Sequence, residues 1–260
     1  MRRDIMAVAG VELELFEAGN GPPILFLHGA GGFVPEHPYV APLSARHRLI
    51  APSHPGFGKS SLPEWIDAVD DIAYIHLELL ERVGLDQVDV IGCSIGGWVA
   101  TELATKAPKS VRRLVLVGPV GVKTGPVDRL DVPDIFALPQ SALEKLLFHD
   151  PDRMTMDPTR LADEQLAIMV RNRETLALLA WEPYMHNPKL PHRLHRVTAP
   201  TLFLRGESDG LVSAEYLAAY ARLLPNARTE TIAAAGHAPH IEQPDAFART
   251  VLKFLDAGAV

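Results

Sequence analysis

Hydrophobic residues in this sequence follow two alternating patterns. Short, mostly apolar runs are typical of strands buried on both faces of a sheet, and they occupy residues 23–27, 48–52, 88–91, 111–117 and 200–204. Apolar residues at helical spacing follow most of them, at 67–83, 95–107, after 213 and from 244 onwards. Strands that alternate with helices form a parallel sheet with helices on both faces. The pattern therefore predicts an α/β fold.

Two segments depart from this alternation. Apolar and polar residues alternate from 8 to 18, which predicts a half-exposed hairpin at the edge of a mostly parallel sheet. From 119 to 197 the sequence lapses into short helical patterns rich in Leu, Met, Phe and Pro, without a convincing strand. We interpret 119–197 as an inserted helical cap, or lid, on a core formed by residues 1–118 and 198–260.

Composition and charge narrow the class of protein. With 260 residues, of which 47% are hydrophobic and 22% charged, the chain can bury one large core. Its net charge of -7 is spread without long runs, so no surface for nucleic acid or an anionic membrane is expected. A single cysteine, Cys93, fits a reducing compartment, and no apolar run has the form of a signal peptide or the length of a membrane span. We expect a cytoplasmic monomer or homodimer that binds a small molecule.

The clearest chemical signal is Gly-Cys-Ser-Ile-Gly at residues 92–96, between a predicted strand and a predicted helix. It matches G-x-S-x-G, the pattern of a nucleophile elbow. A strand that turns into a helix within one residue strains that residue, and the close approach leaves no room for side chains two positions away, which explains Gly92 and Gly96. This turn would expose the Ser94 hydroxyl and direct the first free helix amide, that of Ile95, to the same point.

A serine hydroxyl needs a general base, and the base needs a carboxylate to orient it. Asp209 lies in the loop after the strand at 200–204, and His237 follows a strand that ends near residue 232. Both loops are expected at the carboxyl edge of the sheet, where α/β sites lie. The order Ser, Asp, His is the one that accompanies a genuine G-x-S-x-G elbow. Glu207 is an alternative acid.

Together with His28-Gly29 and Pro-Gly-Phe-Gly-Lys-Ser at 55–60, these motifs resemble the α/β-hydrolase family from residue 11 to the end, apart from the lid. The resemblance implies that Ser94 is the nucleophile, His237 is the general base and then the general acid, and Asp209 orients His237. Because the elbow carries serine, the branches that attack with a carboxylate are disfavoured.

The resemblance also implies an oxyanion hole. Its donors would be the backbone amides of Ile95 and Ala30, with Gly31 as the alternative to Ala30. The implied reaction uses neither a cofactor nor a metal, and the spacing His237-x-x-His240 alone is weak support for a metal site.

Two reactions share this machinery. One is hydrolysis of a small carboxylic ester or related acyl compound, and the other is hydrolysis of a carbon-carbon bond in a vinylogous diketone by ring-cleavage-product hydrolases. The lid of the second group, in which an arginine assists the dienol oxygen, resembles residues 169–174 and Trp181 of this chain. Arg171 or Arg173 would bind an oxyanion bidentately. The oxyanion loop, His-Gly-Ala-Gly-Gly-Phe, lacks the proline of that group's His-Gly-x-Gly-Pro-Gly pattern. We therefore expect an ester hydrolase that works through an acyl-enzyme, with the carbon-carbon hydrolase as the alternative.

Other classes fit less well. A dinucleotide-binding turn at Gly29-Ala30-Gly31 would need a third glycine where Val34 stands and an acidic residue near position 50. A non-catalytic member of the same fold is a rival because fold does not fix function, but the complete Ser-Asp-His set argues against it. The expected substrate contacts are Gly31, Trp98, Arg171, Arg173, Trp181 and His240.

Overall fold

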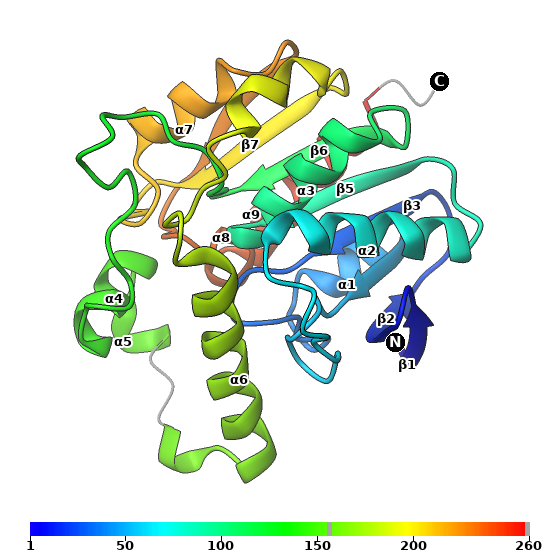
Figure 1. Cartoon of the computed structure of the whole chain (residues 1–260), viewed down its shortest axis with the longest axis horizontal. Coiled ribbons are helices and arrows are strands. Elements are labelled where there is room, and N and C mark those ends of the chain that lie inside the picture. The colour runs from blue at the N-terminus through cyan, green and yellow to red at the C-terminus, as the bar shows by residue number, and fades with distance from the viewer. Residues whose placement is uncertain (155–157, 258–260) are drawn as a thin grey trace.

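The strands form a sheet with the elbow strand, β5, near its middle. The computed structural model describes residues 1–154 and 158–257, and the eight strands found there lie in the order β1-β2-β4-β3-β5-β6-β7-β8. Strands β3 to β8 are parallel, whereas β1 and β2 are antiparallel to their neighbours. The bounds are β1 (Arg2–Val8), β2 (Val11–Ala18), β3 (Pro23–Leu27), β4 (Arg48–Pro52), β5 (Val88–Cys93), β6 (Val111–Val117), β7 (Thr201–Gly206) and β8 (Ala227–Ile232). This mostly parallel sheet confirms the predicted α/β fold (Figure 1).

Helices cover both faces of the sheet. Their bounds are α1 (Val40–Ser44), α2 (Val69–Arg82), α3 (Ile95–Lys106), α7 (Ala214–Ala221), α8 (Pro239–Glu242) and α9 (Pro244–Leu255). Helices α2, α3 and α7 pack into one hydrophobic cluster, and α1 and α9 into a second. Val88 and Val90 of β5 belong to the first cluster and Ile91 and Cys93 to the second, because alternate side chains of a strand point to opposite faces.

The edge hairpin begins earlier in the chain than the sequence predicts. The alternating residues from 11 to 18 form β2, but its partner β1 starts at Arg2, and the turn lies at Ala9 and Gly10. Val8 is the one buried residue of β1. This strand therefore lacks the apolar alternation by which a half-buried strand is recognised.

The segment between β6 and β7 is helical in its described part. It contains α4 (Gln140–Leu147), α5 (Pro151–Met154), the 3-10 helices η1 (Pro158–Arg160) and η2 (Leu190–Arg196), and the long helix α6 (Asp163–Ala180). In Figure 1, α4, α5 and α6 project from one end of the sheet. Its buried residues, among them Val120, Leu176 and Leu190, join the cluster under α2 and α3. The division into a cap at 119–197 and a core stays a prediction, and residues 155–157 of that segment lie outside the described residues.

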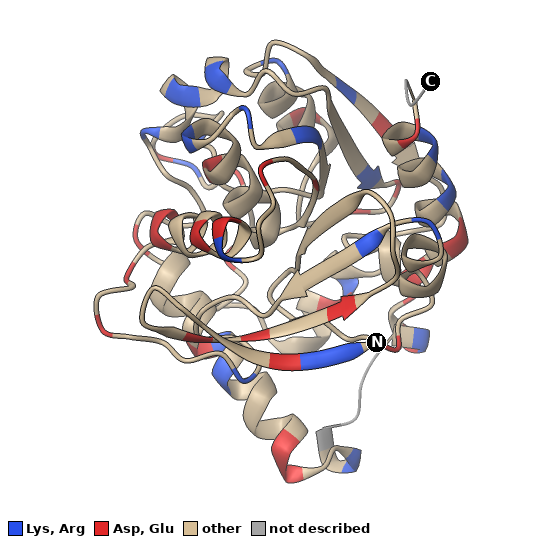
Figure 2. Cartoon of the chain, turned by 90° about the vertical axis from the view of Figure 1, so that its right-hand side faces the viewer, with Lys and Arg blue, Asp and Glu red and all other residues tan. Residues whose placement is uncertain are grey.

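Charged residues are interspersed along strands, helices and loops (Figure 2). Several pair across neighbouring strands at the sheet edge, as Arg2 and Arg48 do with Glu17. In the part of the chain that the structure describes, no helix combines the length and the apolar character needed to cross a bilayer. The expected small-molecule partner and the expected monomer or homodimer stay predictions.

Candidate active site

Ser94 stands at a strained turn between β5 and α3, as the elbow motif predicts. Its backbone has φ 54° and ψ -116°, outside the regions that non-glycine residues favour. A Cβ at position 92 would meet the carbonyl oxygen of Gly96, and one at position 96 would meet the carbonyl oxygens of Leu27 and His28. Only glycine fits at these two positions, and the strained turn holds the serine side chain clear of the sheet.

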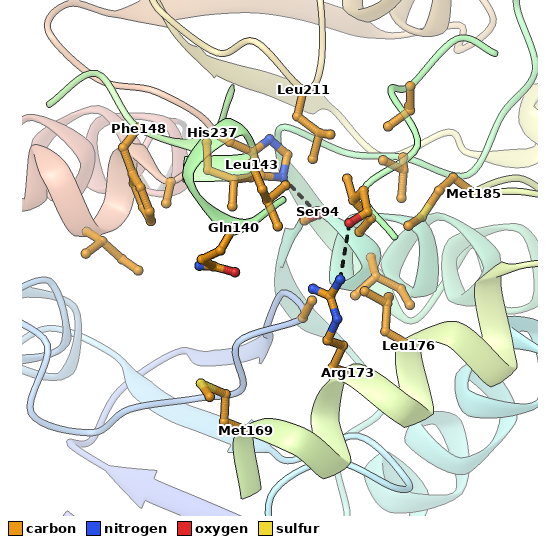
Figure 3. A pocket seen from close by; sticks show the side chains of 18 of the residues that line it. Ser94, Gln140, Leu143, Phe148, Met169, Arg173, Leu176, Met185, Leu211 and His237 are labelled. Carbon is orange, nitrogen blue, oxygen red and sulfur yellow. Dashed lines mark hydrogen bonds between the residues drawn. The ribbon is translucent and has the colours of Figure 1, made fainter. Parts of the chain in front are cut away.

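Three side chains from separate loops form a continuous hydrogen-bonded chain. His237 Nε2 lies 2.9 Å from Ser94 Oγ, and His237 Nδ1 lies 3.0 Å from Asp209 Oδ2 (Figure 3 shows the first of these). The other carboxylate oxygen, Asp209 Oδ1, accepts the amides of Leu211 and Val212 at 2.9 and 2.8 Å. The structure therefore brings together the three residues that the sequence singles out.

The electrostatics of Asp209 favour the ionised carboxylate. Burial alone would raise the pKa of Asp209, but the charge and hydrogen bond of His237 and the amides of Val212 and Leu211 outweigh it, so the pKa lies below its usual value. An ionised carboxylate beside His237 Nδ1 assigns the proton to that nitrogen. Nε2 is then left as an acceptor for the Ser94 hydroxyl.

The alternative acid, Glu207, is not placed to orient the histidine. It is exposed, and its Oε2 accepts the amide of Ala234 at 3.3 Å. The loops of the acid and the base are instead fixed by the end of α4. The carbonyls of Leu146 and Leu147 accept the amides of Gly210 and His237 at 2.9 and 2.6 Å. No sequence motif marks these contacts, because any residue can supply a free carbonyl at a helix end.

The loop after β3 lies directly beside the serine. A Cβ at Gly29 would come within 3.5 Å of the Ser94 Cβ, and Ala30 lines the same cavity as Ser94 and Ile95. His28, which precedes this loop, is buried, with Nδ1 2.7 Å from the Gly29 carbonyl. His28 Nε2 accepts the amide of His54 at 2.9 Å, and His54 Nε2 lies 3.0 Å from the His28 carbonyl. His28 and His54 thus hold the loop in place from the core side.

Ser94 and His237 line a cavity of about 420 Å³ (Figure 3). Its wall is mostly apolar, and the remaining polar side chains that line it are Gln140 and Arg173. Loops of the sheet form its floor, whereas α4 and α6 supply the opposite wall, including Leu143, Leu147, Met169, Val170 and Leu176. The α4 residues were not predictable as part of the cavity, because their leucine spacing is that of any amphipathic helix.

Of the six expected substrate contacts, Arg173 is the one that lines this cavity. The other five, which are absent from its wall, have different surroundings. Trp98 is buried on α3 and donates to Glu102, and Arg171 donates to the Ser60 carbonyl. Trp181 is half exposed against Phe136 and Tyr184, and His240 packs on Tyr39 and Phe247. The Gly31 carbonyl accepts a hydrogen bond from Asn172. Only Arg173 is retained in the proposal below.

Comparison with known proteins places the chain in a family. The sequence matches the alpha/beta hydrolase family over residues 24–250. It is 29% identical to a 2-hydroxymuconate semialdehyde hydrolase of Pseudomonas putida, over 97% of this chain and 93% of the relative. It is 27% identical to a 2-hydroxy-6-oxo-2,4-heptadienoate hydrolase of Pseudomonas putida F1, over 97% of this chain and 96% of the relative. A thermophilic esterase of Thermogutta terrifontis has the same fold, with a TM-score of 0.78 at 24% identity over 99% of both chains.

The chain belongs to the α/β-hydrolase family, and its fold and family identify it as a hydrolase. Proteins similar to this chain differ in the substrates that they are named for, since two relatives are hydrolases of a muconate semialdehyde and a heptadienoate and one protein of the same fold is an esterase. The reaction of this chain must therefore be argued from its own cavity.

Proposed function

We propose that this enzyme hydrolyses the carbon-carbon bond next to the 6-oxo group of a 2-hydroxy-6-oxo-dienoate, the alternative of the two reactions that the sequence allows. The observation that carries the proposal is the guanidinium of Arg173 in a mostly apolar cavity beside Ser94. Its Nη2 donates to the Ile135 carbonyl at 3.3 Å, and it makes no ion pair with a carboxylate of residues 1–154 or 158–257. A cation without a carboxylate partner suits a substrate that brings one.

The relatives support the same choice. The two hydrolases from Pseudomonas putida act, by name, on a muconate semialdehyde and on a heptadienoate. Both molecules carry a carboxylate and a 2-hydroxyl at one end and a carbonyl at the other. The cavity offers the same separation of chemistry, with a guanidinium on the α6 wall and the serine on its floor.

The first half-reaction uses the Ser94, His237 and Asp209 chain. After the 2-hydroxyl proton moves to C5, the substrate carries ketones at C2 and C6. Ser94 Oγ attacks C6 while His237 Nε2 takes its proton, and Asp209 stabilises the imidazolium. The amides of Ala30 and Ile95 are the proposed donors to the developing oxyanion.

Breaking the C5–C6 bond places an electron pair on C5. Conjugation spreads this pair through C3 and C4 to the 2-oxygen, so the leaving group is a dienolate rather than a free carbanion. Arg173 is proposed to bind the carboxylate and this oxygen, which carries more charge in the transition state than in the bound substrate. The imidazolium of His237 returns its proton to the dienolate, and the acyl-enzyme remains on Ser94.

In the second half-reaction, water attacks the acyl-enzyme while His237 acts as base. The products are a carboxylic acid and a 2-hydroxydienoate. Hydrolysis of an ester would follow the same course with an alkoxide as leaving group. This second candidate is favoured by the oxyanion loop, which lacks the proline expected of a carbon-carbon hydrolase, and by the mostly apolar remainder of the cavity wall.

The two candidates are separated by one comparison. Purified enzyme is assayed with 2-hydroxy-6-oxo-2,4-heptadienoate, whose turnover is measured as loss of its visible absorbance. It is also assayed with p-nitrophenyl acetate, butyrate and hexanoate, whose turnover is measured as release of nitrophenolate. We expect kcat/KM for the dienoate to exceed that of every ester by about 100-fold, which is roughly 2.7 kcal/mol in transition-state binding. An excess for any ester would instead identify an ester hydrolase, and Ser94→Ala sets the background for both.

A further inference from the structure

The side-chain amide of Asn172 joins α6 to two loops of the core. Its Nδ2 donates to the Gly31 carbonyl at 3.2 Å, and its Oδ1 accepts the Gly58 amide at 2.9 Å. These partners fix the orientation of the amide, because a backbone N–H needs the oxygen and a carbonyl needs the nitrogen. Asn172 is 3% exposed, so both bonds lie away from water and are costly to break. The next residue on the helix is Arg173, in the wall of the cavity.

Gly31 lies in the loop that carries the proposed oxyanion donor Ala30. The Gly31 carbonyl shares a peptide group with the Gly32 amide, and this amide donates to the Gly29 carbonyl at 3.0 Å. The Gly29 carbonyl in turn shares a peptide group with the Ala30 amide. In a planar trans peptide the N–H points opposite to the C=O. Fixing the Gly31 carbonyl therefore fixes the Gly32 amide, and through the Gly29 carbonyl it fixes the direction of the Ala30 amide.

The backbone of the loop is shaped to admit the asparagine. Gly32 has φ +87°, a conformation that other residues rarely adopt, and a Cβ there would come within 3.1 Å of Asn172 Nδ2. The Gly29 carbonyl is held a second time, by His28 Nδ1 at 2.7 Å. The loop is thus fixed by His28 on the core side and by Asn172 on the α6 side.

We propose that Asn172 is a positioning residue for the oxyanion hole: it aims the Ala30 amide at the developing oxyanion through two peptide groups that a hydrogen bond joins. It does so from the residue adjacent to Arg173, so one turn of α6 orients both the anionic end of the substrate and the hole at its carbonyl end. The inference rests on the proposed serine mechanism, but it holds equally for an ester and for a carbon-carbon bond, since both pass through the same oxyanion.

Two neighbouring side chains on α6 provide the contrast that a test needs. Arg171 Nη2 donates to the Ser60 carbonyl at 2.6 Å, and Thr175 Oγ1 donates to the Gly56 carbonyl at 2.9 Å. Both tie the helix to the loop after β4, and neither forms a hydrogen bond with the described loop at residues 28–32. If Asn172 only anchored the helix, removing the Thr175 hydroxyl would have the same effect as removing the Asn172 amide.

The experiment compares Asn172→Ala and Asn172→Asp with the matched control Thr175→Val. Asn172→Asp keeps an acceptor for the Gly58 amide but replaces the donor to Gly31 by a carboxylate oxygen, which repels the Gly31 carbonyl, so it disrupts the contact to the oxyanion loop and not the one to Gly58. For p-nitrophenyl butyrate and for the dienoate, we expect both Asn172 variants to lower kcat by about 10- to 100-fold, less than the roughly 10²- to 10³-fold loss of an oxyanion donor itself. In the Asn172 variants, KM for the uncharged ester should change by less than about 3-fold. In Thr175→Val, kcat should stay within about 3-fold of the wild-type value.

A transition-state analogue separates positioning from general loss of structure. An aliphatic trifluoromethyl ketone adds to Ser94 Oγ and places its oxyanion in the hole. Its Ki should rise in the Asn172 variants by the same factor by which kcat/KM falls, whereas the Ki of butyrate, a simple product, should not. Equal losses in Asn172→Asp and Thr175→Val, or an unchanged Ki for the ketone, would overturn the role of Asn172.

The rate of covalent labelling of Ser94 by a fluorophosphonate provides a readout that needs no substrate. Slower labelling in both Asn172 variants than in the wild type supports the proposal, and equal rates contradict it. Failure of the wild type to react at all would instead remove the serine mechanism, and with it any catalytic role of Asn172. Labelling of the wild type without turnover of the dienoate would overturn the proposed substrate but leave the Asn172 comparison intact.

Discussion

Arg171 and Arg173 lie two positions apart on α6, but their guanidinium groups bind in different places. Arg171 donates to the Ser60 carbonyl at 2.6 Å, whereas Arg173 lines the cavity and donates to the Ile135 carbonyl at 3.3 Å. Side chains two residues apart on a helix point roughly 200° apart. Only one of the two can therefore face Ser94, and the structure identifies Arg173 as the candidate for binding an anionic group.

Replacing Arg173 should affect charged substrates far more than uncharged ones. We expect Arg173→Ala to lower kcat/KM for the dienoate by about 10- to 150-fold, the range for loss of a hydrogen bond to a charged group. Arg173→Lys should recover part of this, since it keeps the charge but loses the planar fork. Turnover of p-nitrophenyl acetate should change by less than about 3-fold. The control is Arg171→Ala, and equal losses of dienoate turnover in the two alanine variants would contradict the assignment.

Loss of either Ser94 or His237 should abolish turnover of every substrate. Because each acts as part of one hydrogen-bonded unit, Ser94→Ala and His237→Ala should each lower kcat by about 10⁴-fold or more. Asp209→Asn should have a comparable effect, since the amide favours the wrong tautomer of His237. Steady-state kinetics with purified variants measures this, and Glu207→Gln tests the rejected acid. A large loss in Glu207→Gln with an active Asp209→Asn would reverse their roles.

The predictable part of this site is the part that local geometry dictates. The elbow at Ser94 needs glycines at fixed positions, and Asp209 and His237 each follow a strand of the parallel sheet. Their meeting at one edge therefore follows from topology, and the observed hydrogen bonds join these three residues. The fold was predictable for the same reason, because buried parallel strands leave continuous apolar runs, whereas the exposed strand β1 left none.

The cavity wall was not predictable, because it depends on how the inserted helices pack. Trp98 and Trp181 are expected substrate contacts, yet one is buried against Glu102 and the other is half exposed. The choice between Arg171 and Arg173 depends on the rotation of α6 about its axis. Asn172 carries no motif, and its bonds to Gly31 and Gly58 span more than a hundred residues of sequence.

The elbow glycines should tolerate no side chain, unlike Gly31 in the loop after β3. Gly96→Ala would drive a methyl group into the carbonyls of Leu27 and His28, so we expect a loss of about 3 kcal/mol or more in the free energy of unfolding. Gly31 has open space at its Cβ position and no positive φ. Gly31→Ala should therefore change stability by less than about 0.5 kcal/mol. Urea denaturation compares the two, and similar midpoints would show that the close approach at the elbow does not limit stability.

The buried histidines beneath the oxyanion loop should make the fold sensitive to mild acid. Burial lowers the pKa of His28 to about 4 and the pKa of His76 to about 3, and burial also holds the pKa of His54, which lies between them, well below 6.5. His54 Nδ1 and His76 Nε2 are 2.7 Å apart, and His76 Nδ1 has no partner among the described residues. The Gly29 carbonyl and the charge of Glu14 favour the protonated form of His28, but burial outweighs both and keeps its pKa low.

The sign of the pH effect follows from the proton count of each state. Above pH 6.5 these histidines are neutral in both states and contribute nothing, whereas below it the unfolded chain binds protons that the folded chain excludes. The free energy of unfolding should thus fall as the pH drops from 7 to 5, by about 2 kcal/mol each for His28 and His76. Urea titrations at pH 8, 7, 6 and 5 measure this slope. His76→Leu should reduce the fall in the free energy of unfolding between pH 7 and 5 by about the contribution of one histidine, whatever its effect on stability at pH 8. An unchanged fall would show that His76 is not excluded from protonation in the folded state.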